Sequence, residues 1–242
     1  YVNLYLLLNR HDIWRGETFN KVINMKKLKS AAYEHIKNRI LNDKYKAKQL
    51  ISEKEISVEL SMSKTPVKEA LHHLEDENFV VISPRKSVVV TEVDLKLIKD
   101  VFQVRTKIEP LLVELTISFM DRDELKTSLI SFRNRFERLS GKEKVTGDEF
   151  DNLYDSYRYF FAENCGNFFF AKQMRLVYDH LHRIRKVLYG KNNRRLEALE
   201  EHIEIINLIL EDAPVDNIRN LCKKHIEAAQ IDFFKNLNNL NI

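Results

Sequence analysis

Residues 60–71 read Leu-Ser-Met-Ser-Lys-Thr-Pro-Val-Lys-Glu-Ala-Leu, and this stretch decides the fold of the first third of the chain. Ser63 stands where a helix N-cap belongs, and Pro66 is tolerated in the first turn because the N–H that it lacks would be unpaired there anyway. The apolar spacing predicts a helix that runs to about Glu77. Hydroxyl and ammonium groups at a helix N-terminus suit a phosphate backbone, although a solvated helix start with ordinary lysines remains the alternative.

The neighbouring segments extend this helix into a small module. Residues 29–41 have apolar side chains at helical spacing, and residues 42–50 are a polar, Lys-rich loop. Ser52 and Glu55 have capping-box spacing, which predicts a second helix through Leu60. Two β-branched strands follow, at 79–82 and 88–90, around a short basic turn. The order predicted is helix, helix-turn-helix and a small β-hairpin wing.

Composition excludes several other folds. The 242 residues include only 5 Gly and 4 Pro, too few for an all-β chain with many tight turns. No glycine-rich nucleotide-binding motif occurs. The positive charge is concentrated early, with 13 basic against 10 acidic residues over 25–93 and 24 against 24 over 94–242. This small excess is weak evidence for nucleic-acid binding by itself.

The remaining chain is expected to be an all-α bundle of about six helices, which makes the whole protein mostly α. Apolar periodicity and capping signals predict helices over 93–119, 121–139, 146–164, 168–189, 194–210 and 215–237. The aromatic run Phe168-Phe169-Phe170 is expected in the core rather than in a pocket.

Residues 60–85 also carry a family resemblance. Leu60–Leu71, then Leu74, Glu77, Phe79-Val80 and Pro84-Arg85, resemble the winged helix of GntR-type bacterial repressors, whose pattern is L-G-V-S-R-T-P-V-R-E-A-L, then L, E-G-L-V and P-x-R-G. The match covers residues 28–92 without a gap. The resemblance implies DNA contacts from Lys54, Ser63, Lys64, Thr65 and Lys68, and minor-groove contacts from the wing-tip residues Arg85 and Lys86.

This chain departs from the family pattern in two ways. Lysines replace the family arginines at 54, 64 and 68, and lysine lacks the bidentate fork that reads guanine. We therefore expect weaker base discrimination without loss of DNA binding. Ser61 and Ser87 replace family glycines, so Ser61 must adopt an unusual φ or the turn must differ.

The helical part resembles a second family domain. Val104–Leu111 and Phe160–Asn167 are similar to the V-R-x-x-L-E-P-L and A-L-A-E-A-S-G-N of the FCD domain, which binds effectors in one GntR subfamily. His202 and His225 resemble two of its histidines. That domain usually holds a divalent metal through D-x-x-x-H and two later histidines. Here the first two positions are Tyr154 and Arg158, and arginine cannot ligate a cation.

We therefore expect no metal or other cofactor; a retained metal would have to use His202 and His225. These two histidines lie 11 residues before and 12 after Ala213, which places them level with each other across the last helix hairpin. A cationic cavity would suit a small organic acid or a phosphorylated effector. The candidate effector-binding residues are Arg105, Tyr154, Arg158, His202 and His225. The alternative is that both histidines are satisfied core residues and that Arg158 pairs with Asp155.

Three parts of the chain are predicted: an N-terminal extension or tag-like arm over 1–24, a winged helix-turn-helix DNA-binding domain over 25–92, and a helical FCD-like ligand-binding and dimerisation domain over 93–242. Met25 followed by two lysines resembles a natural start, but residues 1–24 could equally be a real arm that packs through Trp14. The apolar run 4–8 is too short for a signal peptide or a membrane span. Cys165 and Cys222 are expected to be buried thiols in a reducing cytoplasm.

The resemblance implies a cytoplasmic, homodimeric transcriptional regulator, most simply a repressor, on a pseudo-palindromic operator in double-stranded DNA, with a small anionic effector. The alternatives are a helical interaction module with weak non-specific DNA binding and a divergent metal-responsive regulator. No enzyme is expected, because no Ser or Cys nucleophile accompanies the histidines in a recognisable pattern.

Overall fold

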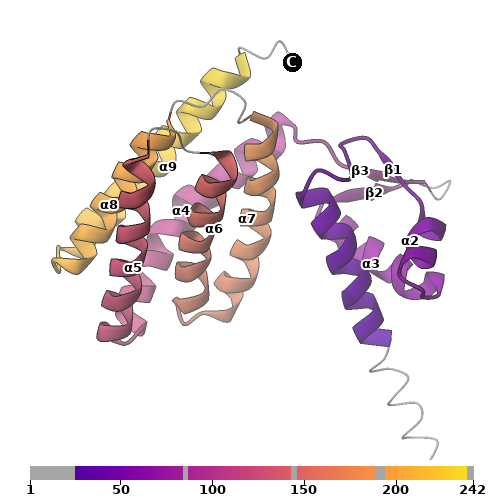
Figure 1. Ribbon diagram of the computed structural model, residues 1–242, viewed down its shortest axis with the longest axis horizontal. Coiled ribbons are helices and arrows are strands. Elements are labelled where there is room, and N and C mark those ends of the chain that lie inside the picture. The colour runs from indigo at the N-terminus through magenta and orange to yellow at the C-terminus, as the bar shows by residue number, and fades with distance from the viewer. Residues whose placement is uncertain (1–24, 84–86, 143–145, 189–193, 239–242) are drawn as a thin grey trace, which may run out of the picture. The chain divides into compact units, whose positions relative to one another are not determined.

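A computed structural model describes residues 25–83, 87–142, 146–188 and 194–238 (Figure 1). The chain divides into two compact units between Glu92 and Val93, and each unit is described by itself below. The candidate arm over 1–24 and the candidate wing-tip contacts Arg85 and Lys86 lie outside the described residues.

The first unit is a helix-turn-helix with a small sheet. A helix over residues 25–41 precedes β1 (Leu50–Ile51), α2 (Glu53–Glu59) and α3 (Lys64–Asp76), and β2 (Val80–Ile82) and β3 (Val88–Val90) follow. α3 buries one side against the rest of the unit because its apolar residues recur every three or four positions. These buried residues are Pro66, Val67, Ala70, Leu71 and Leu74.

The turn between α2 and α3 uses a left-handed residue that is not glycine. Ser61 has φ +50°, and its N–H donates to the carbonyl of Val58. The next N–H, of Met62, donates to the carbonyl of Ser57, which closes the end of α2. The unusual φ expected at Ser61 is therefore present.

The sheet has one strand more than the predicted hairpin. β3 lies in the middle and pairs antiparallel with β2 and with β1. The expectation that residue 50 belongs to a loop was wrong, because Leu50 pairs with Val89. A two-residue strand is too short to have a detectable alternation, and its pairing is set by the fold around it.

The second unit consists, over the residues that the structure describes, of the six helices expected. They are α4 (Leu95–Phe119), α5 (Arg122–Ser140), α6 (Gly147–Asn164), α7 (Phe168–Leu188), α8 (Arg195–Leu210) and α9 (Val215–Asn238). Side-chain caps fix several starts: Asp94 begins α4, Asp121 begins α5, and Thr146 forms a reciprocal capping box with Glu149 at α6. α4 packs along α9 and α5 along α8 (Figure 1).

The core of this unit lies between the helices. Large side chains from α4 to α9 form one continuous apolar cluster, including Phe102, Phe136 and Leu199. The expectation that the aromatic run at 168–170 is core was wrong for two of its three residues: Phe168 and Phe169 are 72% and 75% exposed. They occupy the first turn of α7, where Asn167 caps the backbone N–H groups and the side chains face away from the bundle.

Candidate functional site

The first candidate surface is the start of α3 with the adjoining turn of α2. Ser63, Lys64, Thr65 and Lys68 are all exposed there, as is Lys54 on α2. Lys54 and Lys64 form no ion pair with any other described residue, and Lys68 is 3.9 Å from the carboxylate of Glu53. The five described candidate residues therefore lie on solvent-facing turns of the helix-turn-helix and keep their polar groups available.

The N-terminus of α3 adds a partial positive charge to this surface. The Ser63 side chain makes no capping hydrogen bond, and no acidic residue occurs in the first turn. The N–H groups of that turn therefore have neither a side-chain cap nor a neighbouring carboxylate from their own helix. Such a terminus is suited to an anion such as a phosphate of nucleic acid.

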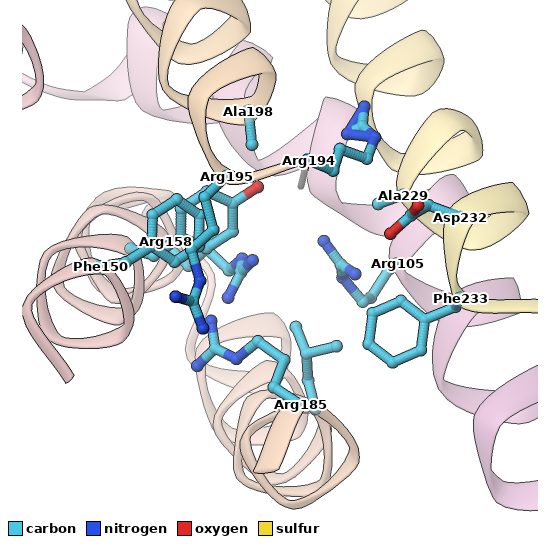
Figure 2. A pocket seen from close by; sticks show the side chains of 12 residues that line it. Arg105, Phe150, Arg158, Arg185, Arg194, Arg195, Ala198, Ala229, Asp232 and Phe233 are labelled. Atoms are coloured by element: carbon cyan, nitrogen blue, oxygen red, sulfur yellow. The ribbon is translucent and has the colours of Figure 1, made fainter. Parts of the chain in front are cut away.

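The second candidate site is a small cavity of about 30 Å³ in the helical unit, between residues of α4, α6, α7, α8 and α9. We call it the arginine cavity. Figure 2 shows the ends of Arg105, Arg158 and Arg185 pointing toward its common space. The five arginines that line it are Arg105, Arg158, Arg185, Arg194 and Arg195, with Phe150, Tyr154 and Phe233 among its apolar walls.

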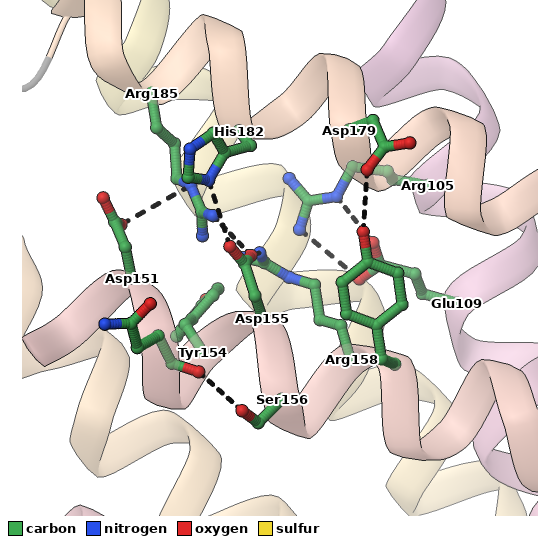
Figure 3. A network of polar contacts seen from close by, with 12 residues as sticks. Arg105, Glu109, Asp151, Tyr154, Asp155, Ser156, Arg158, Asp179, His182 and Arg185 are labelled. Atoms are coloured by element: carbon green, nitrogen blue, oxygen red, sulfur yellow. Dashed lines mark hydrogen bonds and ion pairs between the residues drawn. The ribbon is translucent and has the colours of Figure 1, made fainter. Parts of the chain in front are cut away.

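Carboxylates offset these charges unequally. Arg105 donates to Glu109 on its own helix, at 2.6 Å from Nε to Oε1, and Arg194 donates to both oxygens of Glu201 at 2.8 Å (the first pair is drawn in Figure 3). Burial opposes the charge of Arg105, but its pair with Glu109 raises its pKa. Both guanidinium groups thus have a carboxylate partner, although Glu201 also contacts His225.

Asp155 is shared among three cationic or polar side chains from α6 and α7 (Figure 3). Arg185 donates to it, Nδ1 of His182 is 3.2 Å away, and Nη1 of Arg158 is 3.3 Å away. Burial alone would raise the pKa of this carboxyl, but the His182 contact and the charges of Arg185 and Arg158 hold the pKa well below its usual range. Asp155 therefore stays ionised.

Arg158 is a buried cation that shares its carboxylate with other side chains. It is 6% exposed, and Asp155 is its only carboxylate contact in the described part of the chain. Burial first, and then the neighbouring charges of Arg185 and Arg105, lower its pKa. Its guanidinium carbon lies 3.7 Å from the centre of the Tyr154 ring, in a cation–π contact.

A second small cavity, also of about 30 Å³, shares Arg158 with the first and is lined by His202 and His225. We call it the histidine cavity. The two imidazole rings are 4.4 Å apart, which confirms that α8 and α9 bring them level. Tyr154 stacks on His202 with ring centres 4.4 Å apart, and its hydroxyl hydrogen-bonds Nε2 of His225.

Both histidines are buried and neutral. Burial is the main cause that lowers the pKa of each, and the nearby charges of Arg158, Arg105 and Arg194 lower it further. On the α8 side, Nδ1 of His225 contacts the carboxylate of Glu201. For a neutral ring, this network assigns Nδ1–H as the donor to Glu201 and Nε2 as the acceptor from Tyr154.

Two buried polar atoms face this cavity without a hydrogen-bond partner among the described residues. They are Nδ1 of His202 and the hydroxyl of Tyr157. Buried polar groups are nearly always paired, so such atoms mark a place where a ligand or a water would be stabilised.

The structure brings the five effector candidates together, but around two cavities rather than one. Arg105 and Tyr154 line the arginine cavity, His202 and His225 line the histidine cavity, and Arg158 lines both. Asp155 also contacts Arg158, as expected under the alternative in which this arginine pairs with a carboxylate of its own helix. Sequence reasoning missed Arg185, Arg194, Arg195 and Glu201, since they belong to no quoted motif; the spacing of Arg194 and Glu201 by seven residues on one helix face was the available signal.

The histidine cavity lacks an activated nucleophile. Cys222 lines it, but burial, followed by the charge of Glu109, raises the pKa of this thiol to about 12. A protonated thiol is a poor nucleophile. The geometry therefore favours binding over covalent catalysis at this site.

A helix-turn-helix joined to a helical unit with polar cavities defines a class: DNA-binding transcriptional regulators with a sensor domain. Residues 28–90 match the model of the bacterial regulatory proteins of the gntR family, and residues 100–228 match the FCD domain. The chain belongs to the GntR family and carries an FCD domain. Members of these families are transcriptional regulators, which are not enzymes.

Individual relatives agree with this assignment. The chain is 23% identical over 196 residues to the HTH-type transcriptional regulator YdhC of Bacillus subtilis strain 168, covering 81% of this chain and 84% of that one. It is 22% identical to the HTH-type transcriptional repressor GlaR of Escherichia coli K12, over 70% and 77% of the two chains. The structure of E. coli McbR/YncC superposes with a TM-score of 0.69 at 16% identity, covering 86% of this chain and 97% of that one.

The helices offer no candidate membrane span. Within the described ranges, none combines the length and the apolar character needed to cross a bilayer.

Proposed function

We propose that this protein is a homodimeric, sequence-specific DNA-binding repressor whose operator affinity is controlled by a small anionic effector bound in the helical unit. The observation that carries the proposal is Arg158, a buried and incompletely compensated cation on the wall between two cavities. A buried charge of this kind costs folding free energy unless an opposite charge joins it. An anionic ligand would supply that charge.

The DNA-binding part of the proposal rests on the exposed start of α3. Lys54, Lys64 and Lys68 would neutralise phosphates, and two copies of the unit would face the two halves of a pseudo-palindromic operator. Loss of DNA binding on effector binding would follow if the effector favours a dimer arrangement that fits the operator less well.

Fluorescence anisotropy with a duplex selected from a random library tests the DNA-binding part. The affinity should fall steeply with salt, and Lys64→Gln should weaken binding and reduce the slope of log K against log salt by about 0.9 for each protomer. Lys107→Gln, an exposed lysine of the helical unit, is the matched control and should change neither. A chain that binds no duplex at low salt would refute the proposal.

The second candidate function is an interaction module with weak, non-specific DNA binding. The all-lysine reading surface favours it, because lysine lacks the bidentate geometry that discriminates guanine. The same selection experiment separates the two: enrichment of one palindromic sequence supports the repressor, whereas equal affinity for random and selected duplexes supports the module.

A screen of organic acids and phosphorylated compounds tests the effector part. A compound that raises the melting temperature of the wild-type chain should also change its operator affinity. The thermal shift should disappear in Arg158→Leu. Compounds that stabilise the protein but leave operator affinity unchanged would argue against effector control.

A further inference from the structure

The residues of the histidine cavity do not fit a divalent metal. FCD domains usually hold one with an Asp and a His on one helix and two later histidines, and here the first two positions are Tyr154 and Arg158. Among the residues that the structure describes, no three His, Cys, Asp or Glu side chains are grouped to hold a metal ion. A guanidinium beside the two histidines would also repel a cation.

The contacts of His225 show which groups lie where the family usually holds a metal. A histidine that binds a metal through one nitrogen commonly donates its other N–H to a carboxylate. His225 has that carboxylate, Glu201, at Nδ1. At Nε2, the nitrogen left to bind a metal, it has the hydroxyl of Tyr154 instead. The hydrogen bond from Nδ1 of His225 to a carboxylate is therefore the one that a metal site would have, whereas Nε2 contacts the phenol of Tyr154 in place of a metal.

Arg158 supplies the positive charge at the same place. Its guanidinium lies over the ring of Tyr154, which stacks on His202 and hydrogen-bonds His225, so the charge lies beside the whole cluster. It is almost completely buried and lines both cavities. Asp155 compensates it only in part, because that carboxylate also contacts Arg185 and His182.

We propose that Arg158 is the resident cation of this sensor domain, and that the pair Tyr154 and Arg158 makes the domain independent of metal. The hydroxyl of Tyr154 hydrogen-bonds Nε2 of His225, and Arg158 provides the fixed positive charge that binds the anionic group of a ligand. The second role rests on the anionic effector of the proposed function, whereas metal independence does not.

Metal binding by the full-length chain tests this directly. After treatment with a chelator, the protein is titrated with Zn²⁺, Ni²⁺ or Mn²⁺ alone, and bound metal is measured by calorimetry and by elemental analysis after dialysis. The wild-type chain should retain less than about one tenth of an equivalent. Retention of one equivalent that is lost in His225→Gln would overturn the proposal.

A double substitution that restores the family's metal ligands provides the positive control. Tyr154→Asp combined with Arg158→His places a carboxylate and an imidazole one turn apart on α6, beside His202 and His225. This double variant should bind one equivalent of metal and gain at least several degrees in melting temperature with it. A folded double variant, judged by circular dichroism, that binds no metal would overturn the idea that these two residues occupy a metal position. If the double variant does not fold, the wild-type titration still decides metal independence.

The charge role has its own readout. Acetate and inorganic phosphate, used as probe anions, should raise the melting temperature of the wild-type chain and of Arg158→Lys, but not of Arg158→Leu. Equal stabilisation of all three chains, or of none, would overturn this role. A chain that passes these tests but binds no DNA would refute the proposed function and leave this inference intact.

Discussion

At the scale of the residue, two positions are energetically unfavourable by themselves: Ser61 has a left-handed backbone conformation, and Arg158 is a buried charge. Ser61 adopts φ +50° in the turn before α3, where the family resemblance has glycine. A left-handed conformation costs an L-residue about 1 kcal/mol or more, and glycine avoids most of that cost.

Ser61→Gly should therefore stabilise the first unit by about 0.5–1 kcal/mol, measured by urea unfolding. Ser87→Gly is the matched control, because Ser87 is the other serine at a family-glycine position and its hydroxyl contacts that of Ser83. It should give no gain. A gain of equal size from both substitutions would show that the backbone conformation of Ser61 is not the cause.

Arg158 and Arg185 are both buried arginines near Asp155, but they should respond differently to removal. Arg158→Leu removes a poorly compensated charge while Asp155 keeps Arg185 and His182, so it should cost less than about 1 kcal/mol or even stabilise the apo protein. Arg185→Leu deprives Asp151 and Asp155 of a cation and should cost about 3–5 kcal/mol. Urea unfolding of the two variants compares them, and equal losses would contradict the unequal compensation described here.

At the scale of the element, apolar periodicity predicted the helices and capping residues marked some of their starts. Asp121 and Thr146 stand at the starts of α5 and α6, so the chain marks these boundaries locally. β1 could not be found in this way, because two residues carry no periodicity. The exposure of Phe168 and Phe169 was also misjudged, since composition does not tell which side of a helix start faces the bundle.

The turn between α6 and α7 depends on one glycine. Gly166 has φ +67°, and a Cβ there would lie 2.5 Å from Cγ of Phe119. Gly166→Ala should destabilise the helical unit by about 1–3 kcal/mol, because it combines left-handed strain with a steric clash. Thermal or urea unfolding measures the loss.

Gly141→Ala is the control for this prediction. Gly141 has φ −76°, and an added Cβ would lie 3.5 Å from the carbonyl oxygen of Glu137, an ordinary van der Waals distance. This variant should change stability by less than about 0.5 kcal/mol. A comparable loss in both variants would mean that position 166 has no special requirement for glycine.

At the scale of the whole molecule, the buried histidines couple stability to pH. The folded-state pKa of His202 and of His225 is lowered, so the unfolded chain takes up protons that the folded chain does not as the pH falls below about 6.5. Their contribution to stability is complete above that pH and is lost progressively below it, on the order of 1 kcal/mol for each histidine by a pH of about 5.5. Urea unfolding across this range measures the effect.

The double variant His202→Gln/His225→Gln should flatten that pH dependence. The lowered pKa of Asp155 acts in a different window: its contribution is present above about pH 4 and is lost only as the pH falls further. An unchanged slope between about pH 5.5 and 8 in the double variant would exclude the histidines as the source.

The functional site was predictable only where residues belong to a motif. Tyr154, Arg158, His202 and His225 were found through the resemblance and the hairpin geometry, and the structure brings them together. Arg185, Arg194 and Arg195 were not found, because five arginines from four helices and a helix cap meet only after the bundle has packed. Which cation has a dedicated carboxylate is likewise a property of the packed unit.

The guanidinium between the two cavities has a consequence for the cell that carries this regulator. A sensor domain that must bind a metal ion from solution responds to two concentrations, that of its ligand and that of the free metal. With the charge covalently attached at Arg158, the response threshold would depend on the ligand alone. Metal starvation, or competition from stronger chelators, would then leave the regulator's setting unchanged.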